Sequence, residues 1–202
     1  MRKIYMVLWY IIWPFFSLFR PCRLVGRERL PENGGLFCAN HSALVDPLMV
    51  IMALGPKHQT RVMAKAEFMN IPVLGWLLKK AGIFGVERGK SDMAAIKTAM
   101  RFLKDGENVL MFPEGTRIKN GVDKYGNEGA AKTGAAMLAT RTGMPFVPVY
   151  VPTKKRWFRF TYVIVGEPYH PGTEGQRVSA DEYPAIAEEL MGRIYALKDT
   201  HK

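Results

Sequence analysis

Residues 36–54 read LFCANHSALVDPLMVIMAL, and this stretch contains one complete structural unit. The apolar run at 36–39 is typical of a buried strand. The pair Asp46-Pro47 supplies a helix N-cap and a first-turn proline, which predicts a helix over 47–54. Between the strand and the helix lies a short segment that carries a histidine. A strand that leads through a loop into a helix is the building unit of an α/β fold.

The same alternation continues along the rest of the chain. Short apolar runs typical of strands lie at 61–64, 83–86, 108–112, 146–151 and 160–165. Helical spacing of apolar residues falls between and after them, at 71–80, 91–104, 128–142 and 181–198. Ser91 is the expected N-cap of the second of these helices, Gly143 ends the third, and 169–178 is expected to be a surface loop. We therefore expect an α/β fold with a mixed, mostly parallel sheet flanked by helices.

The composition limits the classes of protein to which the chain can belong. It has 202 residues, 48% hydrophobic and 23% charged, which excludes a largely disordered protein and suits one domain with an appendage. Two cysteines exclude a disulfide framework and a four-cysteine zinc site. The net charge of +11 indicates an anionic partner: nucleic acid, a phospholipid surface or a phosphorylated substrate. No nucleic-acid partner is expected, because the basic residues are dispersed and accompany no stacking-aromatic or DNA-reading motif.

The N-terminal segment favours the phospholipid surface. Residues 4–19 contain no charged side chain, whereas Arg2 and Lys3 precede them and several arginines follow. As a helix this stretch measures about 24 Å, shorter than the roughly 30 Å of bilayer hydrocarbon. Its tryptophans and tyrosines suit the headgroup level, so we expect residues 1–22 to form an interfacial membrane helix and residues 23–202 to form the main domain. A signal peptide lacks its cleavage site here, and a buried core helix remains the other interpretation.

His41 and Asp46 form the strongest candidate for catalysis. They lie in the segment between the expected strand and the expected helix, where the active-site loops of open α/β sheets occur. In such a loop Asp46 can fold back onto the imidazole, fix its tautomer and leave the other ring nitrogen as a general base. The alternative is that Asp46 only caps the helix and that His41 is an ordinary hydrogen-bonded loop residue.

A second candidate lies at 110–117, LMFPEGTR, where a strand enters a Pro-Glu-Gly turn. Backbone amides in a tight turn can face a ligand, and the forked guanidinium of Arg117 suits a phosphate. The alternative is a plain turn followed by a solvated arginine.

The segment 82–91, GIFGVERGKS, is similar to a phosphate-binding P-loop but has Phe84 where that motif requires glycine. A nucleotide site is therefore rejected. Arg88 remains a phosphate candidate, with a surface salt bridge to Glu87 as the alternative. Cys38 and His41 lack further ligands nearby in the sequence, so no metal site is expected.

Four blocks of sequence together resemble a known family. They are Asn40-His41-x4-Asp46-Pro47, the segment from Gly82 to Arg88, the segment from Phe112 to Arg117, and Val147-Pro148-Val149. In this order they resemble the glycerolipid acyltransferases, most closely the bacterial 1-acyl-sn-glycerol-3-phosphate acyltransferases. The resemblance covers about 23–165. Glu87 stands where this family commonly has aspartate, and the N-terminal membrane segment is short.

The resemblance implies an acyltransferase domain in which His41 is the general base, held by Asp46, and in which no cofactor is needed. It implies that the second and third blocks bind the glycerol phosphate. The substrate-binding residues expected on this basis, with Lys65 added as a further phosphate candidate at a strand end, are Arg88, Glu114, Gly115, Thr116, Arg117 and Lys65.

The resemblance also implies the reaction and its place in the cell. The donor would be acyl-CoA or an acyl-carrier protein, and the acceptor lysophosphatidic acid, which would become phosphatidic acid. The enzyme would work on the cytoplasmic face of the cell membrane, against anionic lipid. Two alternatives remain open: an acyltransferase for glycerol-3-phosphate, a lysophospholipid or an ornithine lipid, and a non-catalytic basic membrane-binding protein.

Overall fold

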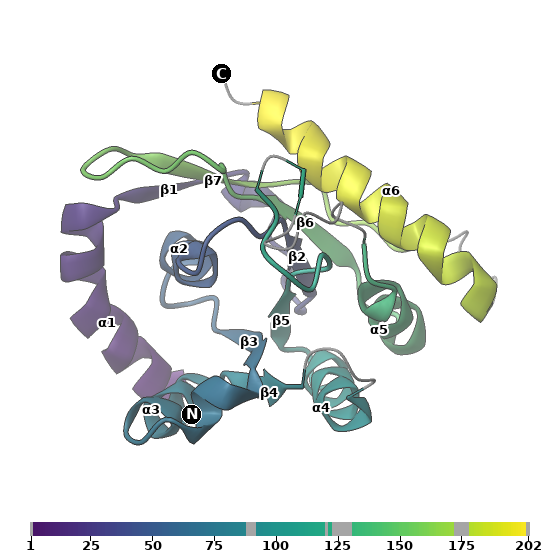
Figure 1. The fold of residues 1–202 in the computed structure, drawn as a ribbon, viewed down its shortest axis with the longest axis horizontal. Helices are drawn as coiled ribbons and strands as arrows, with labels where there is room; N and C mark the ends of the chain where they lie inside the picture. Colours follow the sequence, from purple (N-terminus) through teal and green to yellow (C-terminus); the bar gives the residue numbers. More distant parts are fainter. Residues whose placement is uncertain (1, 88–91, 120, 123–130, 172–177, 201–202) are drawn as a thin grey trace.

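The computed structural model describes residues 2–87, 92–119, 121–122, 131–171 and 178–200. Within these residues one seven-stranded sheet has the order β1-β7-β6-β2-β5-β3-β4 (Figure 1). Its strands are β1 (Cys22–Val25), β2 (Leu36–Ala39), β3 (Thr60–Lys65), β4 (Phe84–Val86), β5 (Asn108–Met111), β6 (Phe146–Tyr150) and β7 (Thr161–Val165). Neighbouring strands are parallel except β6 and β7. The predicted mixed, mostly parallel α/β fold is therefore confirmed.

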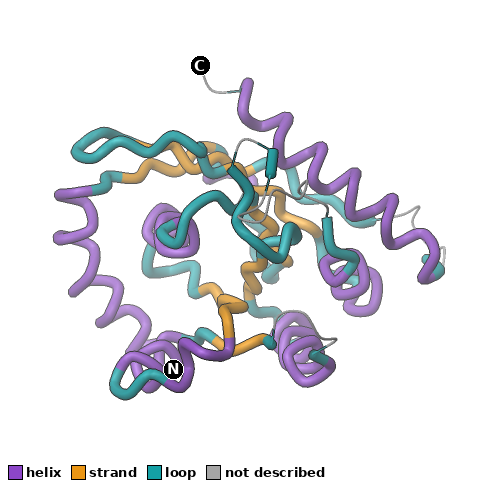
Figure 2. Tube along the Cα trace, viewed as in Figure 1, coloured by secondary structure: helices purple, strands orange, loops and turns teal. Residues whose placement is uncertain are grey.

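Helices cover both faces of the sheet. They are α1 (Arg2–Phe19), α2 (Asp46–Leu54), α3 (Leu74–Ala81), α4 (Met93–Lys104), α5 (Gly134–Thr142) and α6 (Tyr183–Ala196). Figure 1 shows α2 between the sheet and α1, with α4, α5 and α6 on the opposite face. Figure 2 shows how the strands curve around α2. This arrangement leaves the carboxyl ends of β2 to β6 along one edge of the sheet.

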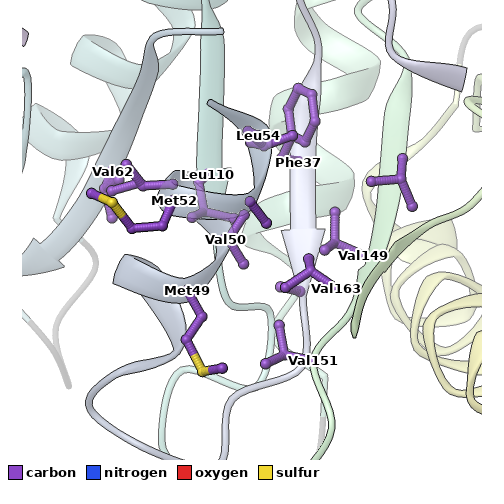
Figure 3. Packing of buried hydrophobic residues seen from close by; sticks show 14 of the residues in the cluster. Phe37, Met49, Val50, Met52, Leu54, Val62, Leu110, Val149, Val151 and Val163 are labelled. Atoms are coloured by element: carbon purple, nitrogen blue, oxygen red, sulfur yellow. The ribbon is translucent and has the colours of Figure 1, made fainter. Parts of the chain in front are cut away.

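The central strand β2 explains the apolar run from which the fold was predicted. Its four residues are all buried, because α2 covers one face of the strand and the other helical layer covers its opposite face. Phe37 and Ala39 point to the α2 side, whereas Leu36 and Cys38 point to the other. Figure 3 shows Phe37 packed with side chains of α2 and of the neighbouring strands. The rigid core thus ends directly beneath the loop that carries the histidine.

Several predicted boundaries need correction. Asp46 is the first residue of α2, with Val45 at the N-cap position. Asp92 caps α4 by accepting a hydrogen bond from the Ala95 amide, while the expected cap Ser91 lies outside the described residues. Helix α3 begins at Leu74, three residues later than expected, after a 3-10 turn at Ala66–Asn70. Helix α5 begins at Gly134, and residues 128–130 lie outside the described part of the chain.

Strand β1 is absent from the sequence prediction. It is short, only partly buried and pairs with β7 from the far end of the chain. The boundary expected after residue 22 falls within this strand. The expected loop at 169–178 also makes one pairing, an antiparallel bridge between Phe146 and Tyr169, while 172–177 lie outside the described residues.

Helix α1 has one side against the protein and a broad apolar surface directed outward. Tyr5 and Trp9 are buried in the core beside α2, and the Trp9 indole donates to the Ile51 carbonyl at 3.3 Å. The outward residues include Val7, Tyr10 and Phe15. Of the helices in the described part of the chain, none combines the length and the apolar composition needed to cross a bilayer.

Candidate active site

The structure brings His41 and Asp46 together where β2 leads into α2. The ring nitrogen Nδ1 of His41 lies 3.2 Å from Oδ2 of Asp46, and both side chains are buried. Because an ionised carboxylate only accepts hydrogen bonds, this contact places the hydrogen of a neutral ring on Nδ1. Nε2 then keeps the lone pair that a general base requires.

Several donors fix the Asp46 carboxylate. Its Oδ2 accepts the amide hydrogens of Ser42 and Ala43 at 2.6 and 2.7 Å, and its Oδ1 lies 2.8 Å from Nζ of Lys155. Burial by itself would raise the pKa of the Asp46 carboxyl. The hydrogen bonds from His41, Lys155 and the Ala43 amide, together with the lysine charge, outweigh burial and lower that pKa below its ordinary value. Asp46 is therefore an anion at neutral pH.

The turn after β5 holds the backbone of His41 from both sides. The His41 amide donates to Oε2 of Glu114 at 2.7 Å, and the His41 carbonyl accepts from the Ile118 amide at 2.7 Å. The ring of Phe112 lies against the imidazole, with 4.4 Å between centroids. The first and third sequence blocks therefore form one hydrogen-bonded unit.

Glu114 is buried, and its two oxygens face two different donors. Oε2 takes the His41 amide, and Oε1 takes the hydroxyl of Tyr195 from α6 at 2.6 Å. Burial raises the pKa of the Glu114 carboxyl, although both hydrogen bonds oppose that rise. Burial also raises the pKa of Tyr195, which therefore keeps the hydrogen that it donates. In this arrangement Glu114 braces His41.

The rest of the turn runs from Gly115 to Arg117 and becomes more exposed toward Arg117. The Gly115 amide donates to the Phe112 carbonyl at 3.0 Å, and Gly115 has a φ of 66°, a conformation that favours glycine. Thr116 is half-buried and Arg117 is exposed. In the part of the chain that the structure describes, the Arg117 guanidinium makes no ion pair.

Two predicted substrate-binding residues, Lys65 and Arg88, remain. Lys65 ends β3 at the same edge of the sheet as His41, and its Nζ lies 2.5 Å from Oε1 of Glu67. Arg88 lies outside the described residues. No group of three His, Cys, Asp or Glu side chains among the described residues could hold a metal ion.

Two participants of the site were missed by the sequence analysis. Lys155 belongs to the basic run Lys154-Lys155-Arg156, which is typical of a solvated surface, and Tyr195 lies on the last helix. Each contacts the site from far along the chain, so no local spacing points to it.

An apolar groove of about 460 Å³ lies between α1 and the start of α2, and neither His41 nor Asp46 lines it. It is lined by α1, by Val45 and Leu48 from the start of α2, and by Trp157.

Comparison with known proteins identifies the family of the chain. Residues 22–152 match the family model described as Acyltransferase, a range that contains His41, Asp46 and Arg117. A 1-acyl-sn-glycerol-3-phosphate acyltransferase of Bacillus subtilis is 31% identical over 183 residues, which are 88% of each chain. One from Pseudomonas aeruginosa is 28% identical over 184 residues, 84% of this chain and 68% of that protein.

Two further likenesses complete the comparison. A chloroplastic enzyme of the same description from Brassica napus is 31% identical over 142 residues, and the match spans 68% of this chain but only 38% of that longer relative. The crystal structure of the 1-acyl-sn-glycerophosphate acyltransferase of Thermotoga maritima superposes with a TM-score of 0.68 at 22% identity, covering 98% of this chain and 80% of that one. That structure shares the fold. On the family match and the Bacillus relative, the chain belongs to the acyltransferase family.

Proposed function

We propose that this protein transfers a fatty acyl group from a thioester to the sn-2 hydroxyl of 1-acylglycerol-3-phosphate, giving phosphatidic acid. The observation that carries the proposal is the 3.2 Å contact between His41 and a fixed, anionic Asp46, in a chain whose relatives are named for this activity. The thioester donor is acyl-CoA or an acyl-carrier protein, both of which are acidic and suit the net charge of +11.

The chemistry follows from the two ring nitrogens of His41. As the acceptor hydroxyl attacks the thioester carbonyl, Nε2 takes the hydroxyl proton while Nδ1–H stays bonded to Asp46. The imidazolium so formed is stabilised by the carboxylate. The tetrahedral intermediate collapses by breaking the carbon–sulfur bond, and Nε2 returns its proton to the departing thiolate. The ester gained balances the thioester lost, and His41 ends as it began.

Acceptor binding is assigned to the turn that braces His41. Arg117 offers a forked, exposed cation for the phosphate, and the Ile118 amide next to it is bonded to the His41 carbonyl. The phosphate and the base are therefore held by adjoining residues, which would bring the acceptor hydroxyl toward Nε2. Gly115 and Thr116 complete the turn. Lys65 ends β3, and Arg88 follows the neighbouring parallel strand β4 in the sequence, so both are proposed as further phosphate contacts.

The setting proposed for the reaction is the cytoplasmic face of the membrane. The outward apolar surface of α1 supports an interfacial position, in which aromatic side chains lie at headgroup level. The basic net charge supports attraction to anionic lipid. In that position an acceptor with an acyl tail can stay partly in lipid while its headgroup meets Arg117.

The test is an acylation assay of the purified protein in anionic vesicles. Lysophosphatidic acid, glycerol-3-phosphate, lysophosphatidylcholine and an ornithine lysolipid are each offered with acyl-CoA and with an acyl-carrier protein. We expect phosphatidic acid from lysophosphatidic acid, with a kcat/KM well above that for the other acceptors. Preference for another acceptor would reassign the substrate, and absence of transfer to every acceptor would leave a membrane-binding protein without catalysis.

A further inference from the structure

Lys155 is a buried cation at the back of the proposed catalytic pair. Its side chain is 4% exposed, and Nζ lies 2.8 Å from Oδ1 of Asp46 and donates to Oγ of Ser42 at 2.8 Å. The adjacent Lys154 and Arg156 are exposed, as is usual for such residues. Removing a lysine charge from water is costly unless it is paired, so this burial needs a compensating partner. Asp46 is that partner.

The loop that delivers Lys155 is anchored on both sides of it. Before Lys155, the amide side chain of Asn40 bonds both the N–H and the carbonyl of Val151, at 2.8 and 2.9 Å. After it, the Phe158 amide donates to the Phe19 carbonyl at 2.9 Å, and Phe158 holds a φ of 59°. A left-handed conformation at a bulky residue persists only where its surroundings enforce it. The place of Lys155 is therefore built into the fold.

We propose that Lys155 is a positioning residue for the His41–Asp46 pair: it holds Oδ1 of Asp46 so that Oδ2 stays aligned with His41, and its charge offsets the carboxylates around the base. This inference rests on the proposed function. Lys155 acts through Asp46 and requires no contact with either substrate. It lies beyond residue 152, outside the segment that matches the family model.

The charges that face His41 come from three elements. Asp46 belongs to α2, Glu114 follows β5, and Lys155 belongs to the loop between β6 and β7. Without Lys155, the Asp46 carboxylate beside the ring would lose the cation that contacts its Oδ1, while the Glu114 carboxylate would stay bonded to the His41 amide. The loss of alignment would lower kcat at every pH.

The test compares four variants of the full chain in the vesicle assay. Lys155→Met removes the charge at similar length, Lys155→Gln keeps a donor without charge, Lys155→Arg keeps the charge, and Lys154→Met is the matched exposed control. We expect Lys155→Met to lower kcat about 10- to 100-fold, as a displaced catalytic group does, with both KM values within about 2-fold of the wild type. Lys155→Gln should lose a similar part of kcat, and Lys155→Arg should restore most of the loss.

Folding is checked by circular dichroism, and if Lys155→Met does not fold, the Gln variant decides. A folded Met or Gln variant with wild-type kcat would overturn the inference. So would a Lys155→Arg variant as impaired as Lys155→Met, because a charge-based role predicts rescue. An inactive wild type would overturn the proposed function and this inference together, whereas an active wild type with an insensitive Lys155 would overturn this inference alone.

Discussion

The loop that carries His41 and the turn that carries Arg117 leave neighbouring strands at one edge of the sheet, and they differ in how fully their side chains are engaged. His41 and Asp46 are buried and bonded on several sides, whereas Arg117 is exposed. The proton-transfer half of the proposed site is thus already organised without substrate. The proposed phosphate-binding half would be engaged only by a bound anion, and so the two halves should fail in different ways when they are changed.

The largest effect is expected at the organised half. His41→Ala removes the proposed base and should lower kcat about 10²- to 10⁴-fold, with the fold retained by circular dichroism. The exposed His170, replaced by alanine, is the matched control and should leave kcat unchanged. Substantial turnover by His41→Ala would contradict the mechanism.

Asp46→Asn should weaken the fold as well as catalysis. At pH 6 the change leaves Lys155 buried without its ionic partner, which should lower the free energy of unfolding by about 3–5 kcal/mol. Because the pKa of Asp46 is depressed in the folded state, its carboxylate stabilises the fold above the ordinary aspartate pKa of 3.8, and this contribution is lost as pH falls through the lowered pKa. The difference between wild type and variant in urea unfolding should therefore shrink between pH 6 and pH 3.

The control for the buried Asp46–Lys155 pair is an exposed ion pair. Glu167 binds Arg29 at 2.8 Å with most of its side chain in solvent, so Glu167→Gln should cost about 0–1 kcal/mol. A loss for Asp46→Asn no larger than this, or one independent of pH, would show that the buried pair does not stabilise the fold.

Arg117→Ala should break the other half alone. The loss of charged hydrogen bonds to a phosphate is worth about 1.5–3 kcal/mol, or roughly 10- to 150-fold in kcat/KM for lysophosphatidic acid. The melting temperature should stay unchanged, since the side chain is exposed. Arg141→Ala, also exposed, is the control. An effect confined to the KM of the acyl donor would show that Arg117 does not hold the acceptor.

Gly115→Ala tests the turn that links the two halves of the proposed site. A Cβ at this position would meet the Lys132 side chain at 3.3 Å and would require a left-handed φ, at a cost of about 1–2 kcal/mol. Because the same turn braces His41 and carries Arg117, kcat and the acceptor KM should both worsen. Gly134→Ala, in helix α5, would bring a Cβ into ordinary contact with the Met111 methyl at 4.0 Å and should be neutral or slightly stabilising. Equal behaviour of the two variants in thermal unfolding would contradict the strain assigned to Gly115.

The part of the molecule predictable from sequence is the part with short-range signals. The apolar run of β2 marks a strand buried on both faces, and the loop to α2 is short enough to keep Asp46 within reach of His41. The exact role of Asp46 differed from the expectation: it accepts the amides of Ser42 and Ala43, which precede it, while lying inside the helix. The contact between Asp46 and His41 was predictable from the sequence, whereas the position of Asp46 inside the helix was not.

The remainder depends on contacts between distant segments. Strand β1 has a charged residue in a four-residue run and is defined by its partner β7. Lys155 belongs to a basic run. It reaches Asp46 only because the chain reverses between β6 and β7 at the edge of the sheet where Asp46 lies. Tyr195 finds Glu114 because α6 packs over the sheet. The sequence around β1, Lys155 and Tyr195 contains no periodic or spaced pattern that would predict these contacts.

The Cζ atom of Arg20 lies 4.0 Å from the centre of the Trp157 ring. The fluorescence of this indole can therefore report on its surroundings. This indole lies two residues from Lys155 and is largely exposed, whereas Trp9 is buried in the core. The emission of the first should respond to the surroundings of the loop, and that of the second should stay constant as an internal standard. Trp13 and Trp76 are exposed as well, so with both replaced by phenylalanine the fluorescence of the chain would follow its binding to a vesicle and the surroundings of the loop that carries Lys155.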